Sequence, residues 1–469
     1  MIPHDVQDLR DQLDAIKSEN ASLRARLEQA LAENERLRRA LDDARRGGKR
    51  QAAPFSRNTP KADPKPSGRK SGAQYGARAG RRVPARVDEQ IRVPLPPTCG
   101  HCGGAVGLAE TRPQFQEDIV RCTVVRRFDV EVGRCRDCGR HVQGRHPLQT
   151  SDALGPAHVQ LGPEAIALAA QLTKERGLSH ADVVEVLHHG YGLEASRSGI
   201  CRAVLRLGEH AAPTYDRLVQ AARTSLMAWL DETGWRVAAQ SHWLWVAVAE
   251  HVTVFAIQAG RGFAEAAALL GKDYNGFLHH DGWRPYYGFP HAFHQTCLAH
   301  LLRRCRDLIA ITSPAAARFP RAVTEHLQRG LALRDRYAAG DVSPHGLAVA
   351  TGRLEAAMDR LLARAVRTPA NRRLAKHLDH ERPFLFSFLH CPGLHATNNV
   401  AERALRPAVC ARKTWGGNRT DAGARAQQIL ASVLRTCRQQ QKDPFPRLVA
   451  LQRSPVAQCL DLAPTAHAP

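Results

Sequence analysis

The sequence predicts a multidomain α/β protein, and three patterns carry that prediction. An apolar heptad repeat covers residues 2–41, two CxxC pairs follow, and apolar β-branched runs then alternate with helical patterns. A chain of 469 residues has room for about two to four domains. With 43% hydrophobic residues it can bury a core, and it contains no run of 18 apolar residues that would predict a transmembrane helix. The polar start MIPHDVQDLR has no apolar stretch of a secretory signal, so we expect a cytoplasmic protein.

The heptad predicts a dimerising coiled coil over residues 1–44. One set of positions is Ile2, Leu9, Ile16, Leu23, Ala30 and Leu37, and the interleaved set is Val6, Leu13, Asn20, Leu27, Asn34 and Leu41. Asn20 and Asn34 fall at a positions, where a buried Asn favours a parallel dimer in fixed register. The alternative is an amphipathic helix that packs on its own chain. The polar remainder of the helix argues against that alternative.

Positive charge is concentrated in two segments of the chain. The net charge is +22, and residues 45–86 hold 13 basic residues and 1 acidic residue. Residues 301–395 hold 16 basic and 8 acidic residues. The segment 45–90 is rich in Gly, Pro and Ser and predicts a flexible basic linker, which can bind DNA phosphates without sequence preference. The alternative is a compositional excess of arginine without a nucleic-acid partner.

Two cysteine pairs predict a zinc ribbon over residues 91–150. The expected ligands are Cys99, Cys102, Cys135 and Cys138, and each pair lies beside glycine. Thiolates at i and i+3 in two tight turns can complete a tetrahedral, structural Zn²⁺ site. The alternation of residues 116–135 predicts a hairpin between the pairs. Disulfides are the alternative, which a reducing compartment disfavours.

Residues 151–215 predict a helical DNA-binding segment. Ser179 and Ser196 are placed to cap two successive helices. The short helix, glycine-containing turn and following helix are similar to a helix-turn-helix, with Arg197 and Arg202 on the recognition helix. Three helices packed together without binding DNA are an equally good interpretation.

Three acidic residues stand at positions from which their side chains can converge. Residues 226–258 predict two buried strands, with Asp231 after the first apolar run and a turn at Gly234; Asp281 follows a short strand, and Glu402 lies in the first turn of a helix. Such carboxylates can hold two Mg²⁺ ions for phosphoryl transfer. Each has an alternative role. Glu232 competes with Asp231 as the ligand, Asp281 can be a turn residue, and Asn399 with Glu402 can form a capping box.

The phrases around these residues resemble the signature blocks of bacterial transposases of the insertion-sequence family numbered sixty-six, of the DDE class. The blocks are Asp231-Glu-Thr-Gly-Trp-Arg-Val, His280-Asp-Gly-Trp, and Asn398-Asn through Glu402-Arg to Arg412-Lys. The resemblance implies an RNase H-like catalytic core over 220–300 and 396–455, with a helical insertion over 301–395. It implies Asp231, Asp281 and Glu402 as ligands of Mg²⁺ or Mn²⁺. It also implies cleavage of element ends, strand transfer to target DNA, small accessory proteins and a place in the nucleoid.

Further residues are expected to support that site. Cys297-Leu-Ala-His300 looks like a motif found after the second Asp in several DDE groups, and Cys and His at i and i+3 share a helix face. We expect a structural role, in which the two residues orient the active site or pack beneath it. Metal binding is the alternative, and no second Cys/His pair supports it. Candidate DNA contacts around Glu402 are Arg403, Arg406, Arg412, Lys413 and Arg419. Trp415 can stack on a base or pack in the core. A helix over 421–441 is expected to close the core, and the tail 456–469 to be disordered.

Two other functions fit parts of the sequence. A non-catalytic DNA-binding regulator needs only the zipper, the zinc ribbon and the helix-turn-helix. A Mg²⁺-dependent nuclease needs the carboxylates but no strand transfer.

Overall fold

The structure is a computed structural model that describes most of the chain in two compact units, residues 1–117 and 118–469. The described residues are 13, 16–34, 83–98, 100–116, 122–149, 160–364, 366–391, 393–454 and 456–463. In that part of the chain no helix is long and apolar enough to cross a membrane.

In the first unit, residues 16–34 are helical, as the heptad predicts. The heptad residues Leu13, Ile16, Leu23 and Leu27 are all exposed in the single chain, so an apolar stripe is available for a partner helix. Pairing of two such helices stays a prediction. Residues 1–12, 14–15 and 35–44 of the predicted coiled coil lie outside the described residues, as do residues 45–82 of the predicted linker.

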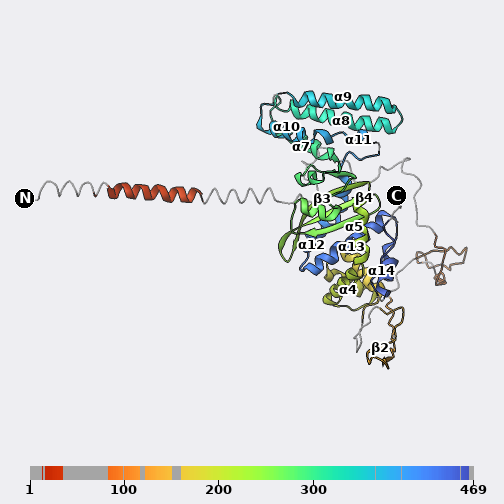
Figure 1. The fold of residues 1–469 in the computed structure, drawn as a ribbon. Coiled ribbons are helices and arrows are strands. Elements are labelled where there is room, and N and C mark those ends of the chain that lie inside the picture. The colour runs from red at the N-terminus through yellow and green to blue at the C-terminus, as the bar shows by residue number, and fades with distance from the viewer. Residues whose placement is uncertain are drawn as a thin grey trace, which may run out of the picture. The chain divides into compact units, whose positions relative to one another are not determined.

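The second unit is built on a five-stranded mixed sheet (Figure 1). Its strands are β3 (Met227–Val237), β4 (Gln240–Ala249), β5 (Thr253–Gln258), β6 (Phe277–His280) and β7 (Phe293–Thr296). The order across the sheet is β5-β4-β3-β6-β7. The first three strands pair antiparallel as a meander, and β6 and β7 run parallel to β3.

The meander differs from the two strands and the turn at Gly234 that we expected. Residues 226–258 form three strands, and β3 continues through Asp231 and Gly234 to a tight turn at Ala238 and Ala239, both with positive φ. The strand continues because Trp235 and Val237 alternate inward and are buried. Asp231 therefore lies in the middle of a strand rather than at its end.

Helices cover the sheet and extend one apolar core beyond it. They are α2 (Pro163–Lys174), α3 (His180–Tyr191), α4 (Arg197–His210), α5 (Ala212–Arg223), α6 (Phe263–Leu270), α12 (Asn399–Trp415), α13 (Asp421–Gln439) and α14 (Pro444–Arg453). The predicted caps at Ser179 and Ser196 are present. The core runs without a break from α2 and α4 through the sheet to α13, so the predicted helix-turn-helix packs on the sheet domain.

Helix α13 covers the outer edge of β5 through hydrogen bonds as well as apolar contacts. The backbone N–H groups of Thr253, Phe255 and Ile257 donate to side chains of α13 at four-residue spacing, namely Thr436, Ser432 and Gln428. An edge strand exposes alternate N–H groups, and one helix face presents residues four apart. The pairing fixes α13 along the sheet, as the predicted closing helix requires.

The segment 301–395 is helical, as predicted, and has its own core. Its elements are α7 (Leu298–Ile311), α8 (Arg318–Ala338), α9 (Pro344–Leu362), α10 (Pro369–Glu381), η3 (Arg382–Phe384) and α11 (Ser387–His390). A second apolar cluster joins these helices, and Figure 1 shows α8, α9 and α10 grouped beside one end of the sheet.

Two other expectations differ from the structure. Among described residues between the CxxC pairs, only β1 (Val132–Arg134) is a strand, and it pairs with β2 (His141–Gln143) beyond the second cysteine pair. The ladder forms there because the turn through Gly139, at φ +68°, reverses the chain. The start of the expected disordered tail is ordered, since Leu462 is buried in the core. Residues 464–469 lie outside the described residues.

Candidate active site

The sheet register places Asp231 and Asp281 side by side. In the parallel pair, Met227 lies opposite Phe277 and Trp229 opposite His279. The same offset carries Asp231 opposite Asp281, which directly follows β6. Equivalent positions on adjacent strands point to the same face of a sheet. The two carboxylates therefore share one face, although 49 residues separate them in the sequence.

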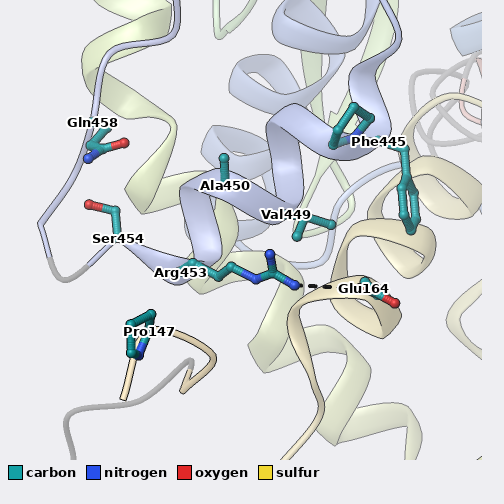
Figure 2. Close-up of a pocket in the computed structure, with 9 residues that line it drawn as sticks. Pro147, Glu164, Phe445, Val449, Ala450, Arg453, Ser454 and Gln458 are labelled. Atoms are coloured by element: carbon teal, nitrogen blue, oxygen red, sulfur yellow. Dashed lines mark ion pairs between the residues drawn. The ribbon is translucent and has the colours of Figure 1, made fainter. Parts of the chain in front are cut away.

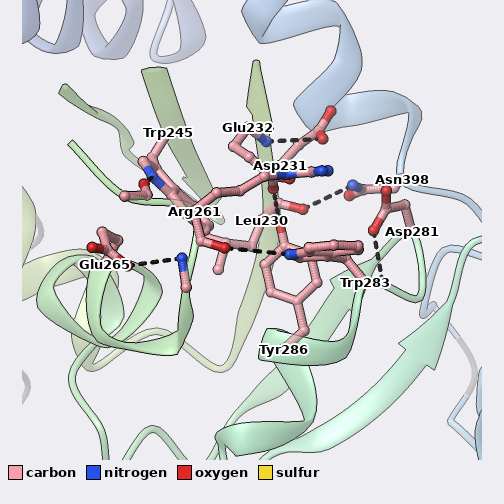
Figure 3. A network of polar contacts seen from close by, with 12 residues as sticks. Leu230, Asp231, Glu232, Trp245, Arg261, Glu265, Asp281, Trp283, Tyr286 and Asn398 are labelled. Carbon is pink, nitrogen blue, oxygen red and sulfur yellow. Dashed lines mark hydrogen bonds and ion pairs between the residues drawn. The ribbon is translucent and has the colours of Figure 1, made fainter. Parts of the chain in front are cut away.

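The start of α12 is tied to the same place. The Asn398 side chain donates to the carbonyl of Leu230 at 2.9 Å (Figure 3). The backbone N–H of Asn398 donates to the sulfur of Cys297 at 3.1 Å. These two bonds hold the first turn of α12 against β3 and α7. Glu402 lies in that turn, so its carboxylate is brought toward Asp231.

The capping-box alternative for Glu402 is not what the structure shows. The N-cap of α12 is Asn398, without a side-chain capping bond. The Glu402 Oε1 atom is shielded from solvent and has no hydrogen-bond partner. The carboxylate is therefore free of the backbone contacts that a capping box requires.

The acidic residues lie close enough to affect one another. Burial raises the pKa of Asp231 well above its usual value, and the charges of Glu232, Asp281 and Glu402 raise it further. Like charges held together in a site of low polarity are stabilised by a bound cation. The residues therefore fit the expected divalent metal in kind and position. The Asp281 carboxylate is held in place by a hydrogen bond that it accepts from the backbone N–H of Trp283, at 2.9 Å.

Glu232, the competing ligand, is engaged on the opposite side of β3. Its side chain is 1% exposed, and its Oε1 pairs with the Arg261 Nε at 2.5 Å. The hydroxyl of Tyr286 donates to its other oxygen (Figure 3). Burial raises the pKa of Glu232, while Tyr286 and Arg261 act against that rise. Both oxygens have partners, so Asp231 is the better metal ligand of the two.

Arg261 is a site residue that sequence reasoning missed. Its guanidinium lies over the rings of Trp243 and Trp283, at 4.7 and 4.2 Å from their centroids. Trp283 belongs to the His280-Asp-Gly-Trp block, but Arg261 stands in a loop with no motif around it. Arg261 therefore links that block, through Trp283, to Glu232 on β3.

The helical insertion reaches the site through Glu381 at the end of α10. This buried carboxylate accepts hydrogen bonds from the hydroxyls of Tyr287 and Thr296. A Cβ placed on Gly282, which has φ +88°, would stand 3.2 Å from its Oε1. Gly282 thus allows α10 to approach the turn that carries Asp281. The sequence offered no signal for Glu381.

A cleft of about 440 Å³ opens beside Asp281. Its walls include Trp283 from the loop after Asp281, His300, Arg303 and Arg304 from α7, and His377 from α10. A larger cavity of about 630 Å³ lies where α2 and α14 meet (Figure 2). It holds the ion pair of Glu164 and Arg453, at 3.5 Å, and none of the three acidic residues lines it.

Most of the predicted basic DNA contacts are exposed. They are Arg197 and Arg202 on α4, and Arg403, Arg406, Lys413 and Arg419 on and after α12. Arg412 is the exception: it is buried, and its guanidinium donates to the Thr233 hydroxyl at 3.3 Å. It packs α12 on β3 because helical periodicity turns it inward.

Trp415 packs in the interior, one of the two roles expected for it. Its ring lies edge-on to Trp235 with centroids 5.6 Å apart, and its Nε1 donates to the Gly177 carbonyl at 3.0 Å. Trp415 is only partly buried, so stacking on a base stays a prediction.

The predicted zinc ligands are described only in part. Cys99 lies outside the described residues, and Cys102 belongs to the first unit. In the second unit, backbone N–H groups of Cys138 and Asp137 face the Cys135 sulfur, and together with the Cys138 thiol they lower its pKa. This turn suits a thiolate, and the four-cysteine site stays a prediction.

Comparison with known proteins agrees with the motif blocks. Residues 158–426 match the sequence model of the transposase IS66 family. An uncharacterized protein of Sinorhizobium fredii, y4qI, is 23% identical over 327 residues, covering 62% of this chain. The match spans 60% of the length of that relative.

Proposed function

Because the chain belongs to the IS66 family of transposases, a family of DNA-processing enzymes, we propose that it cleaves the ends of an insertion sequence and joins them to target DNA. The observation that carries this proposal is the convergence of Asp231, Asp281 and Glu402 from β3, β6 and α12. The order and directions of the five strands support an RNase H-like core.

The three carboxylates are proposed to hold divalent ions, Mg²⁺ or Mn²⁺. When bound, two such ions activate a water or a 3′-hydroxyl and stabilise the leaving oxygen. The chain itself supplies position. The register of β3 and β6 places the two aspartates side by side. The bond from Asn398 to Leu230 fixes the position of Glu402 relative to β3. The pair of Glu232 and Arg261 holds the β3 backbone from its other face.

DNA must approach a strongly acidic site, so flanking positive charge is needed. We propose that the exposed Arg403, Arg406, Lys413 and Arg419 bind the strands beside Glu402, and that Arg197 and Arg202 bind DNA on α4. The basic linker 45–90 would add sequence-independent affinity. Pairing through residues 1–44 would bring two element ends into one complex, and the four cysteines would hold a structural Zn²⁺.

A joining assay with the wild-type chain separates this function from its two rivals. Duplexes that carry precleaved element ends are incubated with a supercoiled plasmid target, with and without Mg²⁺. We expect covalently joined products only with Mg²⁺. Plasmid nicking without joined ends would indicate a nuclease, and DNA binding without any product would indicate a regulator. Either result would overturn the proposal.

A further inference from the structure

Three possible metal ligands meet where the first turns of α7 and α12 face each other, and one of them is Glu402. Cys297 is the N-cap residue of α7, His300 lies in the first turn of α7, and Glu402 lies in the first turn of α12. One sulfur, one imidazole nitrogen and one carboxylate oxygen lie within 4.8 Å of one another. Of the groups of three potential ligands in the described residues, only this one is so closely gathered.

Two of these atoms are buried and stand at ion-pair distance without a hydrogen bond. The His300 Nδ1 and the Glu402 Oε1 are shielded from solvent and make no hydrogen bond. They face each other at 3.6 Å, too far for a hydrogen bond. Two ligands bound tetrahedrally to one ion, at bond lengths of about 2.0–2.1 Å, stand about 3.4 Å apart. The gap between the atoms thus suits a shared cation.

The sulfur of Cys297 is prepared as a ligand by the backbone around it. Cys297 is buried, and N–H groups of Asn398, His300 and Ala299 point to its sulfur. The N–H groups of His300 and Ala299 stand three and two residues after the cysteine. The same offsets occur at Cys135, whose sulfur faces the N–H groups of Cys138 and Asp137. The Cys-Leu-Ala-His turn therefore shares the local geometry of the predicted zinc-binding CxxC turn.

A nucleophilic role for Cys297 does not fit this environment. Burial raises the pKa of its thiol, against the effect of the three N–H groups, so the reactive thiolate is disfavoured unless a cation binds it. A cation that binds the sulfur displaces its proton to solvent.

We propose that Cys297, His300 and Glu402 bind one divalent cation of the zinc class. Thiolate and imidazole ligands favour Zn²⁺, whereas Mg²⁺ prefers oxygen ligands throughout. Three protein ligands leave the fourth position of the ion open to water. The site uses only Oε1 of Glu402, which leaves Oε2 for the Mg²⁺ expected with Asp231. This cation fixes the orientation of the Glu402 carboxylate, and the inference stands independently of the proposed DNA chemistry.

The test is the metal content of the full-length chain. Wild type and His300→Ala are purified in parallel, loaded with Zn²⁺, passed through a desalting column and analysed by mass spectrometry of the metal. We expect the variant to hold one Zn²⁺ per chain fewer than wild type, whatever the four-cysteine site contributes. Cys305→Ala is the control, because this buried cysteine of α7 is not in the cluster, and its zinc content should equal that of wild type.

Cobalt gives a second readout that reports the ligands themselves. With Co²⁺ in place of Zn²⁺, the thiolate charge-transfer absorption should fall in Cys297→Ser and the visible bands should change in His300→Ala. Equal zinc content in wild type and His300→Ala, with cobalt spectra that coincide, would overturn the site. His300 is partly exposed, so that variant is expected to fold, and an unchanged urea unfolding midpoint of the metal-free chain verifies it. Failure of the joining assay alongside a one-zinc difference would overturn the proposed function and leave this site intact.

Discussion

Replacing Arg261 by methionine should lower the free energy of unfolding by about 3 kcal/mol. Glu232 is 1% exposed and pairs with Arg261 at 2.5 Å, so the variant leaves a buried carboxylate with only the Tyr286 hydroxyl. Removing one partner of a buried ion pair costs about 3–5 kcal/mol. We expect the lower end because the Arg261 side chain is 32% exposed, and water can enter where it stood. Methionine keeps the apolar contact with the two tryptophans.

Urea unfolding of a double-mutant cycle measures this cost. Glu232→Gln alone should cost about 1 kcal/mol because its bond from Tyr286 remains possible. The double variant should cost little more than that, so the coupling energy should be about 3 kcal/mol. Arg236→Met, an exposed position of β3, is the control and should change stability by less than about 0.5 kcal/mol.

The pH dependence of the same variant has a definite sign. Arg261 acts against the burial that raises the pKa of Glu232, so its loss raises that pKa further above the unfolded value. A group with a raised folded-state pKa stabilises the protein at low pH and loses this contribution as pH rises through that pKa. The cost of Arg261→Met should therefore be larger at about pH 8 than at about pH 5. A cost below about 1 kcal/mol at the higher pH, or one that does not shrink at the lower, would refute the reasoning.

Three further predictions concern packing, charge and DNA binding. Gly208→Ala should lower the free energy of unfolding, measured in urea, by about 1–3 kcal/mol, since its Cβ would stand 2.9 Å from that of Ala426. The control Gly190→Ala lies in open space on α3 and should not destabilise the chain. Equal effects would show that α4 does not pack closely on α13. Asp231→Asn should stabilise the metal-free chain near neutral pH, because it removes a buried charge. This gain should disappear as pH falls through the raised pKa of Asp231, where the wild-type carboxylate becomes neutral too. Thermal melting at several pH values checks this, and parallel curves of melting temperature against pH for the two proteins would count against it. Neutralising the basic residues of 45–86 should make the salt dependence of DNA binding shallower, by about 0.9 in log–log slope for each phosphate that the chain no longer neutralises, whereas an unchanged slope would mean that this charge is compositional.

The elements with strong local signals were predicted well from the sequence. Ser179 and Ser196 are helix caps, Asp281 follows a short strand, and Glu402 lies in the first turn of its helix, as expected. These features depend on residues a few positions apart, which a sequence displays directly. The approach of Asp231 to Asp281 depends on strand register, which no local pattern displays; it was expected from their positions after apolar strands and from the motif resemblance.

The errors arise where distant contacts decide the outcome. Asp231 was expected at a strand end, but packing of Trp235 against α12 carries β3 past it. Arg412 was grouped with the exposed basic residues around Glu402, but the face of α12 that meets β3 includes it. Arg261 and Glu381 act through residues far away in the sequence, so no local pattern marks them.

The central claim is that three carboxylates carry metal-dependent joining of DNA, and single-charge variants test it most directly. Asp231→Asn, Asp281→Asn and Glu402→Gln are compared with the exposed control Asp273→Asn for binding and joining of precleaved ends in Mg²⁺. We predict that all four bind the DNA like wild type, and that joining falls at least about a hundredfold in the three site variants only. Wild-type joining by any of the three site variants would contradict the account.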